Sequence, residues 1–270
     1  MSSPEPQPSD HPVRYEVDRG LAMITFDRAA AMNALDTPTK EALRDAVQQA
    51  ADDDEVRCVL LTGTGRAFCV GQDLREHIAL QRAGDESLWS TVPKHYSPVA
   101  LMLATMGKPV VAALNGVAAG AGASIAMAAD IRIIAESAGF NLAFAGIALS
   151  CDTGSSWWLP RLVGMARAKE LLLMPRTVRA AEALELGLAT EVVPDDELPA
   201  RGIQVARQLA AGPTQAYAAI RQAVVFSAAH DLQTSLDREA ELMALTGATE
   251  DHHEAVDAFV GKRTPTFQGR

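Results

Sequence analysis

The sequence is poor in the residues that build disulfide frameworks and metal sites. It has three cysteines among 270 residues, Cys58, Cys69 and Cys151, and their spacing fits no metal-ligand pattern. An odd number leaves at least one thiol unpaired, which favours a reducing compartment over a secreted protein. We therefore expect a cytoplasmic protein without a metal.

Positive charge is also scarce, with 24 Lys and Arg against 34 Asp and Glu and a net charge of −10. This balance argues against a nucleic acid or an anionic membrane as the main partner. The first ten residues show neither the basic nor the apolar region of a signal peptide, and we expect residues 1–12 to be a disordered tail. The uncharged run 109–129 is rich in Gly and Ala and includes Asn115. It therefore carries too little apolar area to favour membrane insertion.

Two common catalytic signatures are incomplete or absent. Gly63 and Gly65 follow an apolar run as in a dinucleotide-binding fingerprint, but Phe68 occupies the third glycine position. No Gly-x-Ser-x-Gly sequence occurs. The sequence thus argues against a nicotinamide or flavin enzyme and against a hydrolase with a serine triad.

The first half of the chain alternates between strand and helix patterns. A hairpin is expected over 13–26, a helix capped by Asp36 or Thr37 follows it, and VRCVLLTG (56–63) is typical of a buried strand. This order indicates an α/β core with parallel strands. From Ser155 onward the pattern is helical, with helices expected near 155–163, 166–173, 180–186, 195–210, 213–228, 231–245 and 249–261.

Small residues concentrate where a strand is expected to pass into a helix, in NGVAAGAGASIAMAAD (115–130). The first N–H groups of a helix have no partner within it and lie at the positive end of its dipole. Small side chains at 119–122 would let a substrate carbonyl reach them, and Gly71 would expose the N–H of Gln72 in the same way. The N–H groups of Gln72 and Ala121 could then form an oxyanion hole. Close helix–sheet packing explains the glycines equally well.

Three segments, GRAFCVGQDL, KPVVAALNGVAAGAGA and LPRLVGMARAKELLL, together resemble the crotonase, or enoyl-CoA hydratase/isomerase, superfamily. The resemblance extends from about Val13 to Phe267. It implies an α/β, ClpP-like fold of repeated ββα units over 13–200, followed by a helical trimerisation region over 201–270. It also implies an acyl-CoA thioester substrate, no cofactor beyond the coenzyme A of that substrate, a homotrimer or hexamer, and oxyanion-hole amides at Gln72 and Ala121.

The resemblance breaks down at the acids of the hydratases. Their two catalytic glutamates match Ser124 and Phe144, so the usual two-acid addition of water is not expected. Asp152, in LSCDTGSSWW, matches instead the catalytic aspartate of the 1,2-epoxyphenylacetyl-CoA isomerase branch and the nucleophilic aspartate of 4-chlorobenzoyl-CoA dehalogenases. Apolar surroundings would raise its pKa and suit it to act as a base. By residue pattern alone, an Asp before Thr-Gly-Ser is more typical of a helix N-cap.

The expected function is therefore an acyl-CoA isomerase in which Asp152 moves a proton and shifts a double bond from 3-enoyl to 2-enoyl, or in a related unsaturated or aromatic acyl-CoA. The alternatives are an enoyl-CoA hydratase, use of Asp152 as a nucleophile, and an inactive acyl-CoA-binding protein. His77 and His95 could line the acyl pocket. His252 and His253 are adjacent in the sequence, so they cannot share one helix face as two metal ligands, and we expect no metal site there. The resemblance implies contacts to substrate or coenzyme A from Arg28, Arg66, Ala67, Phe68, Gly71, Gly120, Phe259 and Lys262.

Overall fold

The computed structural model describes residues 11–270. Most of the predicted disordered tail, residues 1–10, lies outside the described residues. Within the described part, the carbonyl of Pro12 already accepts a hydrogen bond from the N–H of Asp27, at 2.9 Å.

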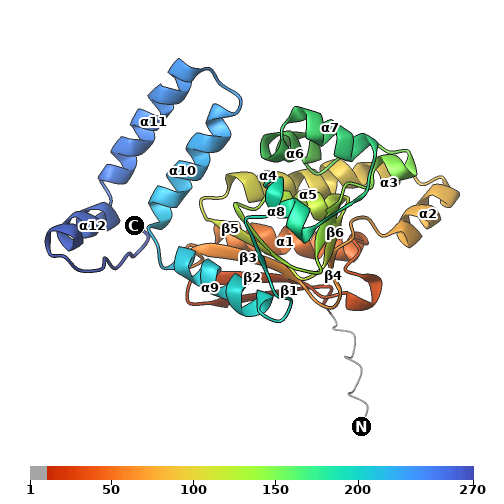
Figure 1. Cartoon of the computed structure of the whole chain (residues 1–270), viewed down its shortest axis with the longest axis horizontal. Helices are drawn as coiled ribbons and strands as arrows, with labels where there is room; N and C mark the ends of the chain where they lie inside the picture. Colours follow the sequence, from red (N-terminus) through yellow and green to blue (C-terminus); the bar gives the residue numbers. More distant parts are fainter. Residues whose placement is uncertain (1–10) are drawn as a thin grey trace, which may run out of the picture.

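A six-stranded sheet forms the base of the molecule (Figure 1). The predicted hairpin is present as β1 and β2, paired antiparallel with Asp18 opposite Leu21. From β2 onward the neighbouring strands run parallel. In spatial order the strands are β1 (Val13–Asp18), β2 (Leu21–Phe26), β3 (Cys58–Gly63), β5 (Val110–Leu114), β7 (Ile131–Ala135) and β10 (Glu191–Val193).

A second sheet of four short strands begins where the strands of the first sheet end. Its order is β4 (Ala67–Cys69), β6 (Val117–Ala119), β8 (Gly139–Asn141) and β9 (Thr177–Arg179). The pairs β3/β4, β5/β6 and β7/β8 each place one strand in either sheet, and helical segments follow them. This repetition confirms the predicted ββα units. The expectation of a purely helical chain after Ser155 is wrong, because β9 and β10 complete the edges of the two sheets.

The helices largely follow the predicted ranges. Asp36 caps α1 by accepting a hydrogen bond from the N–H of Thr39. Residues 74–96, whose sequence has no clear period, contain α2, α3 and a π-helical turn, η2. The bounds are α1 (Thr37–Asp52), α2 (Leu74–Ala83), α3 (Ser87–Thr91), η2 (Val92–Tyr96), α4 (Ser97–Thr105), α5 (Ala121–Met127), α6 (Ser155–Val163), α7 (Met165–Leu173), α8 (Ala180–Glu185), α9 (Leu198–Ala210), α10 (Thr214–Ser227), α11 (Leu232–Gly247) and α12 (Glu250–Val260).

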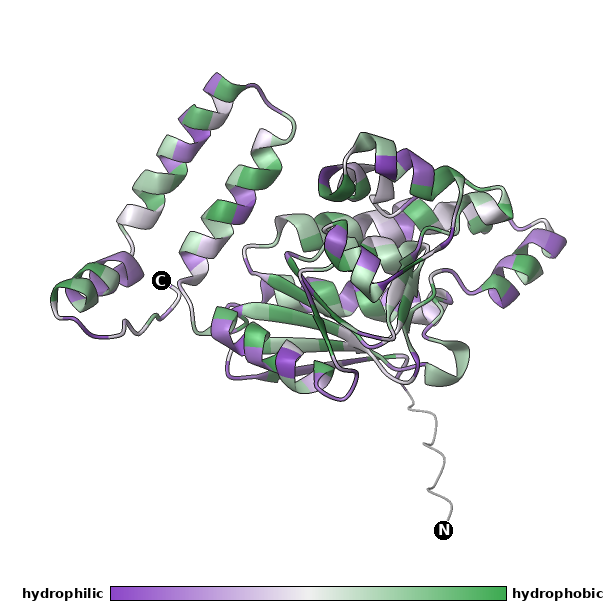
Figure 2. Ribbon diagram, in the orientation of Figure 1, coloured by the Kyte–Doolittle hydropathy of each residue, from purple (hydrophilic) through white to green (hydrophobic). Residues whose placement is uncertain are grey.

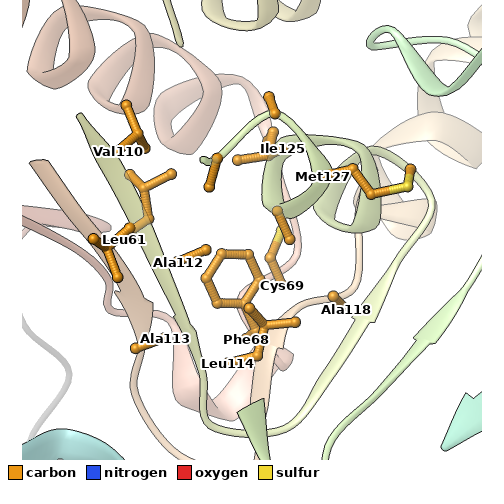
Figure 3. Close-up of a cluster of buried hydrophobic side chains, with 14 of the residues drawn as sticks. Leu61, Phe68, Cys69, Val110, Ala112, Ala113, Leu114, Ala118, Ile125 and Met127 are labelled. Carbon is orange, nitrogen blue, oxygen red and sulfur yellow. The ribbon is translucent and has the colours of Figure 1, made fainter. Parts of the chain in front are cut away.

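The hydrophobic core includes buried side chains from both sheets and from the helices packed on them, among them α1, α4, α5 and α9. Phe68 is fully buried there, edge-on to Phe26 with ring centroids 5.3 Å apart. Figure 3 shows its ring among Ala112, Leu114 and other buried side chains. The core thus fixes β4, the strand that leads into Gly71 and Gln72.

The last three helices, α10 to α12, extend away from the core as an arm (Figure 1). Arg221 on α10 holds the arm to the core through an ion pair with Asp130 at 2.9 Å and a hydrogen bond to the carbonyl of Lys108 at 2.7 Å. Apolar residues recur along α10 and α11 (Figure 2). The predicted boundary after residue 200 falls inside α9, which buries Gly202, Ala206 and Ala210. The helices of the arm begin only after Ala210, the last residue of α9. The domain division at residue 200 and the trimerising role of these helices stay predictions.

Candidate functional site

The two predicted amides come from segments that lie against each other at the edge of the small sheet. Gly71 has a φ of +81°, and a Cβ added there would lie 2.8 Å from the carbonyl oxygen of Ala119 and 3.1 Å from the nitrogen of Ala121. The parallel pairing of β4 with β6 brings these segments together. Only glycine combines this backbone conformation with such a close approach. The fold therefore brings Gln72 next to the first turn of α5.

Both amides are free to bind a ligand. Leu35 bridges the segment at Gln72 by donating to the carbonyl of Gly71 at 2.8 Å and accepting from the N–H of Asp73 at 3.1 Å. This parallel pattern turns the N–H of Gln72 away from Leu35, toward the β6 side. Ala121 is the first residue of α5. Neither N–H has a hydrogen-bond acceptor among residues 11–270.

The glycines of the opening of α5 serve two purposes. A Cβ at Gly122 would lie 2.1 Å from the carbonyl oxygen of Cys69, so this glycine is required for close packing of α5 on β4. Gly120 has nothing within 4 Å of its missing Cβ, and its φ of +51° with ψ of −125° suits only glycine. Packing thus explains Gly122, whereas Gly120 leaves open space in front of the Ala121 amide.

Asp152 lies in the loop that precedes α6, and it is half-buried. Burial raises the pKa of its carboxyl, against a hydrogen bond from the Thr153 hydroxyl that lowers it. That hydroxyl donates to Oδ1 at 2.7 Å. The side chain is no N-cap, because Gly154 occupies the cap position of α6 and no side chain caps it. The capping interpretation of Asp152 is therefore excluded, and the base interpretation is left as a prediction.

The Asp152 loop is held in an uncommon conformation. Thr153 has a φ of +53°, which is rare for a β-branched residue and costs about 1–3 kcal/mol. The Ser155 N–H donates to the carbonyl of Asp152 at 2.9 Å, and the Ser155 hydroxyl lies 2.5 Å from that of Ser124 on α5. The structure thus ties the Asp152 loop to the helix that carries Ala121.

The positions that match the hydratase glutamates hold no acid. Ser124 is fully buried and bonded to Ser155, and Phe144 is buried as well. The negative charge of Asp152 raises the pKa of Tyr96. The Tyr96 hydroxyl donates to Gln72 Oε1 at 2.5 Å. Of the acids that sequence reasoning considered at this site, Asp152 is the carboxylate present.

The predicted coenzyme A contacts differ in how accessible and how paired they are. Ala67 and Phe68 are buried and can offer only backbone, while Arg66 is exposed. Arg28 is engaged by Asp36 and Asp73, with nitrogen–oxygen distances of 2.9 and 3.3 Å, so its charge is already balanced within the protein. A role for these residues in substrate binding stays a prediction.

Phe259 and Lys262 lie on the arm rather than at the site. Phe259 is 85% exposed at the end of α12, and Lys262 follows it. In Figure 1, α12 lies on the opposite side of the molecule from β4 and β6. The two residues therefore lie away from the site formed within this chain, and their contact with coenzyme A stays a prediction.

A pocket of about 250 Å³ opens beside the Gln72 side chain, between α1, α3 and η2. His95 lines it, and burial followed by the nearby Lys40 lowers the pKa of its imidazole. His77 instead packs edge-on against Trp89, with ring centroids 6.1 Å apart. No three His, Cys, Asp or Glu side chains within residues 11–270 gather as metal ligands, and no helix there is long and apolar enough to cross a bilayer.

Sequence reasoning missed three residues at this site. Tyr96, Lys40 and Ser155 contact Gln72 or the Asp152 loop, but a buried tyrosine, lysine or serine has no distinctive sequence pattern. The π-helical turn that places Tyr96 likewise has no distinctive sequence pattern. Tyr96 and Lys40 contact Gln72 from 24 and 32 residues away in the chain, so only the packing of these segments shows that they belong to the site.

The chain is similar to known proteins over nearly its whole length. A family model described as "Enoyl-CoA hydratase/isomerase" matches residues 16–270. A Rhodobacter capsulatus protein named "Probable enoyl-CoA hydratase" is 42% identical over 97% of this chain and 100% of its own. The Escherichia coli 1,2-epoxyphenylacetyl-CoA isomerase is 39% identical over 94% of this chain and 97% of its own. A Mycobacterium abscessus crystal structure, described as "putative Enoyl-CoA hydratase/isomerase", superposes with a TM-score of 0.92 at 41% identity, covering 96% of this chain and 100% of its own.

Proposed function

Because the chain belongs to the enoyl-CoA hydratase/isomerase family, we propose that it is an acyl-CoA isomerase that uses Asp152 as its base. One observation carries this proposal. Asp152 is a desolvated carboxylate on a loop tied through Ser124 and Ser155 to α5, the helix that begins with the Ala121 amide, while Ser124 and Phe144 stand at the positions of the hydratase acids. Water addition needs a second acid that these positions do not supply.

In the proposed reaction, the thioester oxygen accepts hydrogen bonds from the N–H groups of Gln72 and Ala121. Removing a proton from the carbon next to the thioester creates an enolate, whose negative charge develops on that oxygen. Preorganised amides stabilise the developing charge without reorganising during the reaction. The macrodipole at the start of α5 adds to this stabilisation, because its positive end lies at Ala121.

Asp152 takes the proton from C2 of a 3-enoyl thioester, the electron pair moves to the oxygen, and the protonated Asp152 returns the proton at C4. The double bond then lies between C2 and C3, and the carboxylate is regenerated. No water, metal or electron acceptor enters this balance, so we propose that no cofactor is needed beyond the coenzyme A of the substrate.

A hydratase remains the second candidate, since the Rhodobacter relative bears that name. Such an enzyme would have to activate water with Asp152 alone. The two functions yield different products, because hydration forms a 3-hydroxyacyl thioester and isomerisation does not.

We also propose that the chain works as a homotrimer or hexamer. The exposed Phe259 and the nearby Lys262 would then border the coenzyme A bound by a neighbouring copy. A cytoplasmic location, expected from the unpaired cysteines, stays a prediction.

The test of the proposed function compares Asp152→Asn with the wild-type protein on 3-enoyl-CoA thioesters, including phenylacetyl-derived ones, in deuterated water. We expect wild-type protein to exchange substrate protons and form the 2-enoyl product. The Asp152→Asn variant should lose at least about 100-fold in rate, the scale of general-base catalysis, with thioester affinity nearly unchanged. Full activity of this variant, or accumulation of a 3-hydroxyacyl product, would reject the proposal.

A further inference from the structure

The Gln72 side chain is held on both sides by polar groups, of which Tyr96 and Lys40 are buried. Its Oε1 accepts from the Tyr96 hydroxyl at 2.5 Å and from Lys40 Nζ at 3.3 Å. Its Nε2 donates to Glu76 Oε2 at 3.2 Å. Tyr96 and Lys40 are each only 3% exposed. An oxyanion hole uses only the backbone of Gln72, so this side-chain network has no part in the reaction as proposed.

Ion pairing, hydrogen bonds and burial set the protonation states of the groups in this network. Lys40 Nζ also pairs with Glu76 at 2.9 Å, and Glu76 accepts from the N–H of Thr37 at 2.8 Å. Burial opposes ionisation of Glu76, yet these hydrogen bonds keep its pKa below the usual value. Burial first, and then the Asp152 carboxylate, raise the pKa of Tyr96. Tyr96 therefore stays protonated at physiological pH and can donate its hydroxyl hydrogen to Gln72.

The peptide that carries the Gln72 N–H needs such support. It joins Gln72 to Gly71, and a glycine permits rotation of its flanking peptides that other residues would restrict. On the Leu35 side, one backbone hydrogen bond to the Gly71 carbonyl restrains the peptide plane. The Gln72 side chain adds a further restraint, because the buried Tyr96 hydroxyl holds its Oε1.

Tyr96 itself is delivered by an unusual element. It is the last residue of the π-helical turn η2, directly before α4. Such turns are rare and occur frequently at functional sites. Three titratable groups, Asp152, Cys69 and Glu76, raise the pKa of Tyr96 through their charge. Lys40 Nζ lies 6.0 Å from the centre of the Tyr96 ring.

From this geometry we propose that Tyr96 is a positioning residue: through the Gln72 side chain, its hydroxyl fixes the direction of the Gln72 amide that binds the thioester oxygen. The inference rests on the proposed oxyanion hole. In this proposal Tyr96 acts through Gln72 and touches neither the thioester oxygen nor the reacting carbons.

The test uses Tyr96→Phe, Gln72→Met and the double variant. Each single change breaks the hydrogen bond but retains the bulk of the side chain and the Gln72 N–H. Misalignment of a transition-state donor lowers kcat more than it raises KM. We expect each single variant to lose about 10- to 100-fold in kcat, less than complete removal of such a donor would cost. Because both changes break one link, the double variant should be no slower than the slower single variant.

Tyr15→Phe is the matched control. The Tyr15 hydroxyl is buried in β1 and has no hydrogen-bond partner among the described residues, so its loss should leave kcat unchanged. A second readout needs no turnover. Binding of cinnamoyl-CoA should shift its absorbance to the red because the hole polarises its carbonyl, and the shift should shrink in Tyr96→Phe and Gln72→Met but not in Tyr15→Phe.

An unchanged kcat with a full red shift in Tyr96→Phe, or losses that simply multiply in the double variant, would overturn the inference. Failure of the proposed function is seen separately, as a wild-type protein that exchanges no substrate protons. In that case the red shift of the bound thioester still decides whether Tyr96 controls the amide.

Discussion

At the scale of single residues, the environment of Asp152 decides which protonation state it holds. Burial raises the pKa of its carboxyl, and the Thr153 hydroxyl opposes that effect with one hydrogen bond. A base must be ionised before it can accept a proton. The proposed reaction should therefore lose rate as pH falls through this raised pKa, at a higher pH than for a solvent-exposed aspartate.

Thr153→Val tests this balance, because it keeps the β-branched shape but removes the hydroxyl. Loss of a hydrogen bond to the ionised form disfavours that form, so the pKa of Asp152 should rise further. The acid limb of kcat/KM against pH should therefore move upward. Thr153→Ser, which retains the hydroxyl, should leave the limb near its wild-type position. A limb that moves downward in Thr153→Val would contradict the assignment of Asp152 as the base.

At the scale of elements, the site depends on how closely α5 approaches β4. Gly122 on the helix lies directly against the carbonyl of Cys69, and this contact sets the distance between the amides of Ala121 and Gln72. The Ser124–Ser155 contact then joins α5 to α6 and to the Asp152 loop. The three groups of the proposed mechanism therefore share one packing arrangement.

Gly122→Ala should disturb that arrangement, since its Cβ would lie 2.1 Å from a backbone oxygen that cannot move aside cheaply. We expect a loss of about 1–3 kcal/mol in the free energy of unfolding, measured by urea denaturation. Gly247→Ala at the end of α11 is the control, because nothing lies within 4 Å of its missing Cβ. A Gly122→Ala protein as stable as Gly247→Ala would show that the contact is not required.

At the scale of the whole molecule, the arm is attached at its base and apolar along its length. Arg57, just before β3, donates to Thr214 Oγ1 at 2.9 Å and to the Phe267 carbonyl at 3.1 Å, which ties both ends of the arm to the core. Beyond these contacts, large apolar side chains on the arm stay exposed, among them Val224, Leu232, Met243, Phe259 and Val260. Exposed apolar side chains in such numbers are typical of an interface between subunits.

Phe259→Asp should weaken the proposed assembly by placing a charge in that interface. In sedimentation velocity, we expect wild-type protein at the mass of a trimer or hexamer and the variant at a smaller mass. His253→Asp adds a charge about 120° away around the same helix and should keep the wild-type mass. A monomeric wild-type protein would refute the trimer or hexamer, and with it the role of Phe259 at a neighbouring site.

Much of this protein could be predicted from local pattern. The glycine-rich segments identified the family, and capping residues and breaks in apolar periodicity placed α1 and the C-terminal helices within a few residues. These features depend on neighbours along the chain, so they can be predicted from the sequence alone. The short strands β6, β8, β9 and β10 were missed, because three residues are too few to show a period.

By itself, the sequence determined which chemistry was available: two exposed-amide candidates, one aspartate, and serine and phenylalanine in place of the hydratase acids. Only the tertiary structure decided that Asp152 caps no helix, that Arg28 is already paired, and that Tyr96 and Lys40 hold Gln72. The reason is physical. Residue type sets which bonds a group can make, but burial and partners arise only when segments distant in the chain pack against each other.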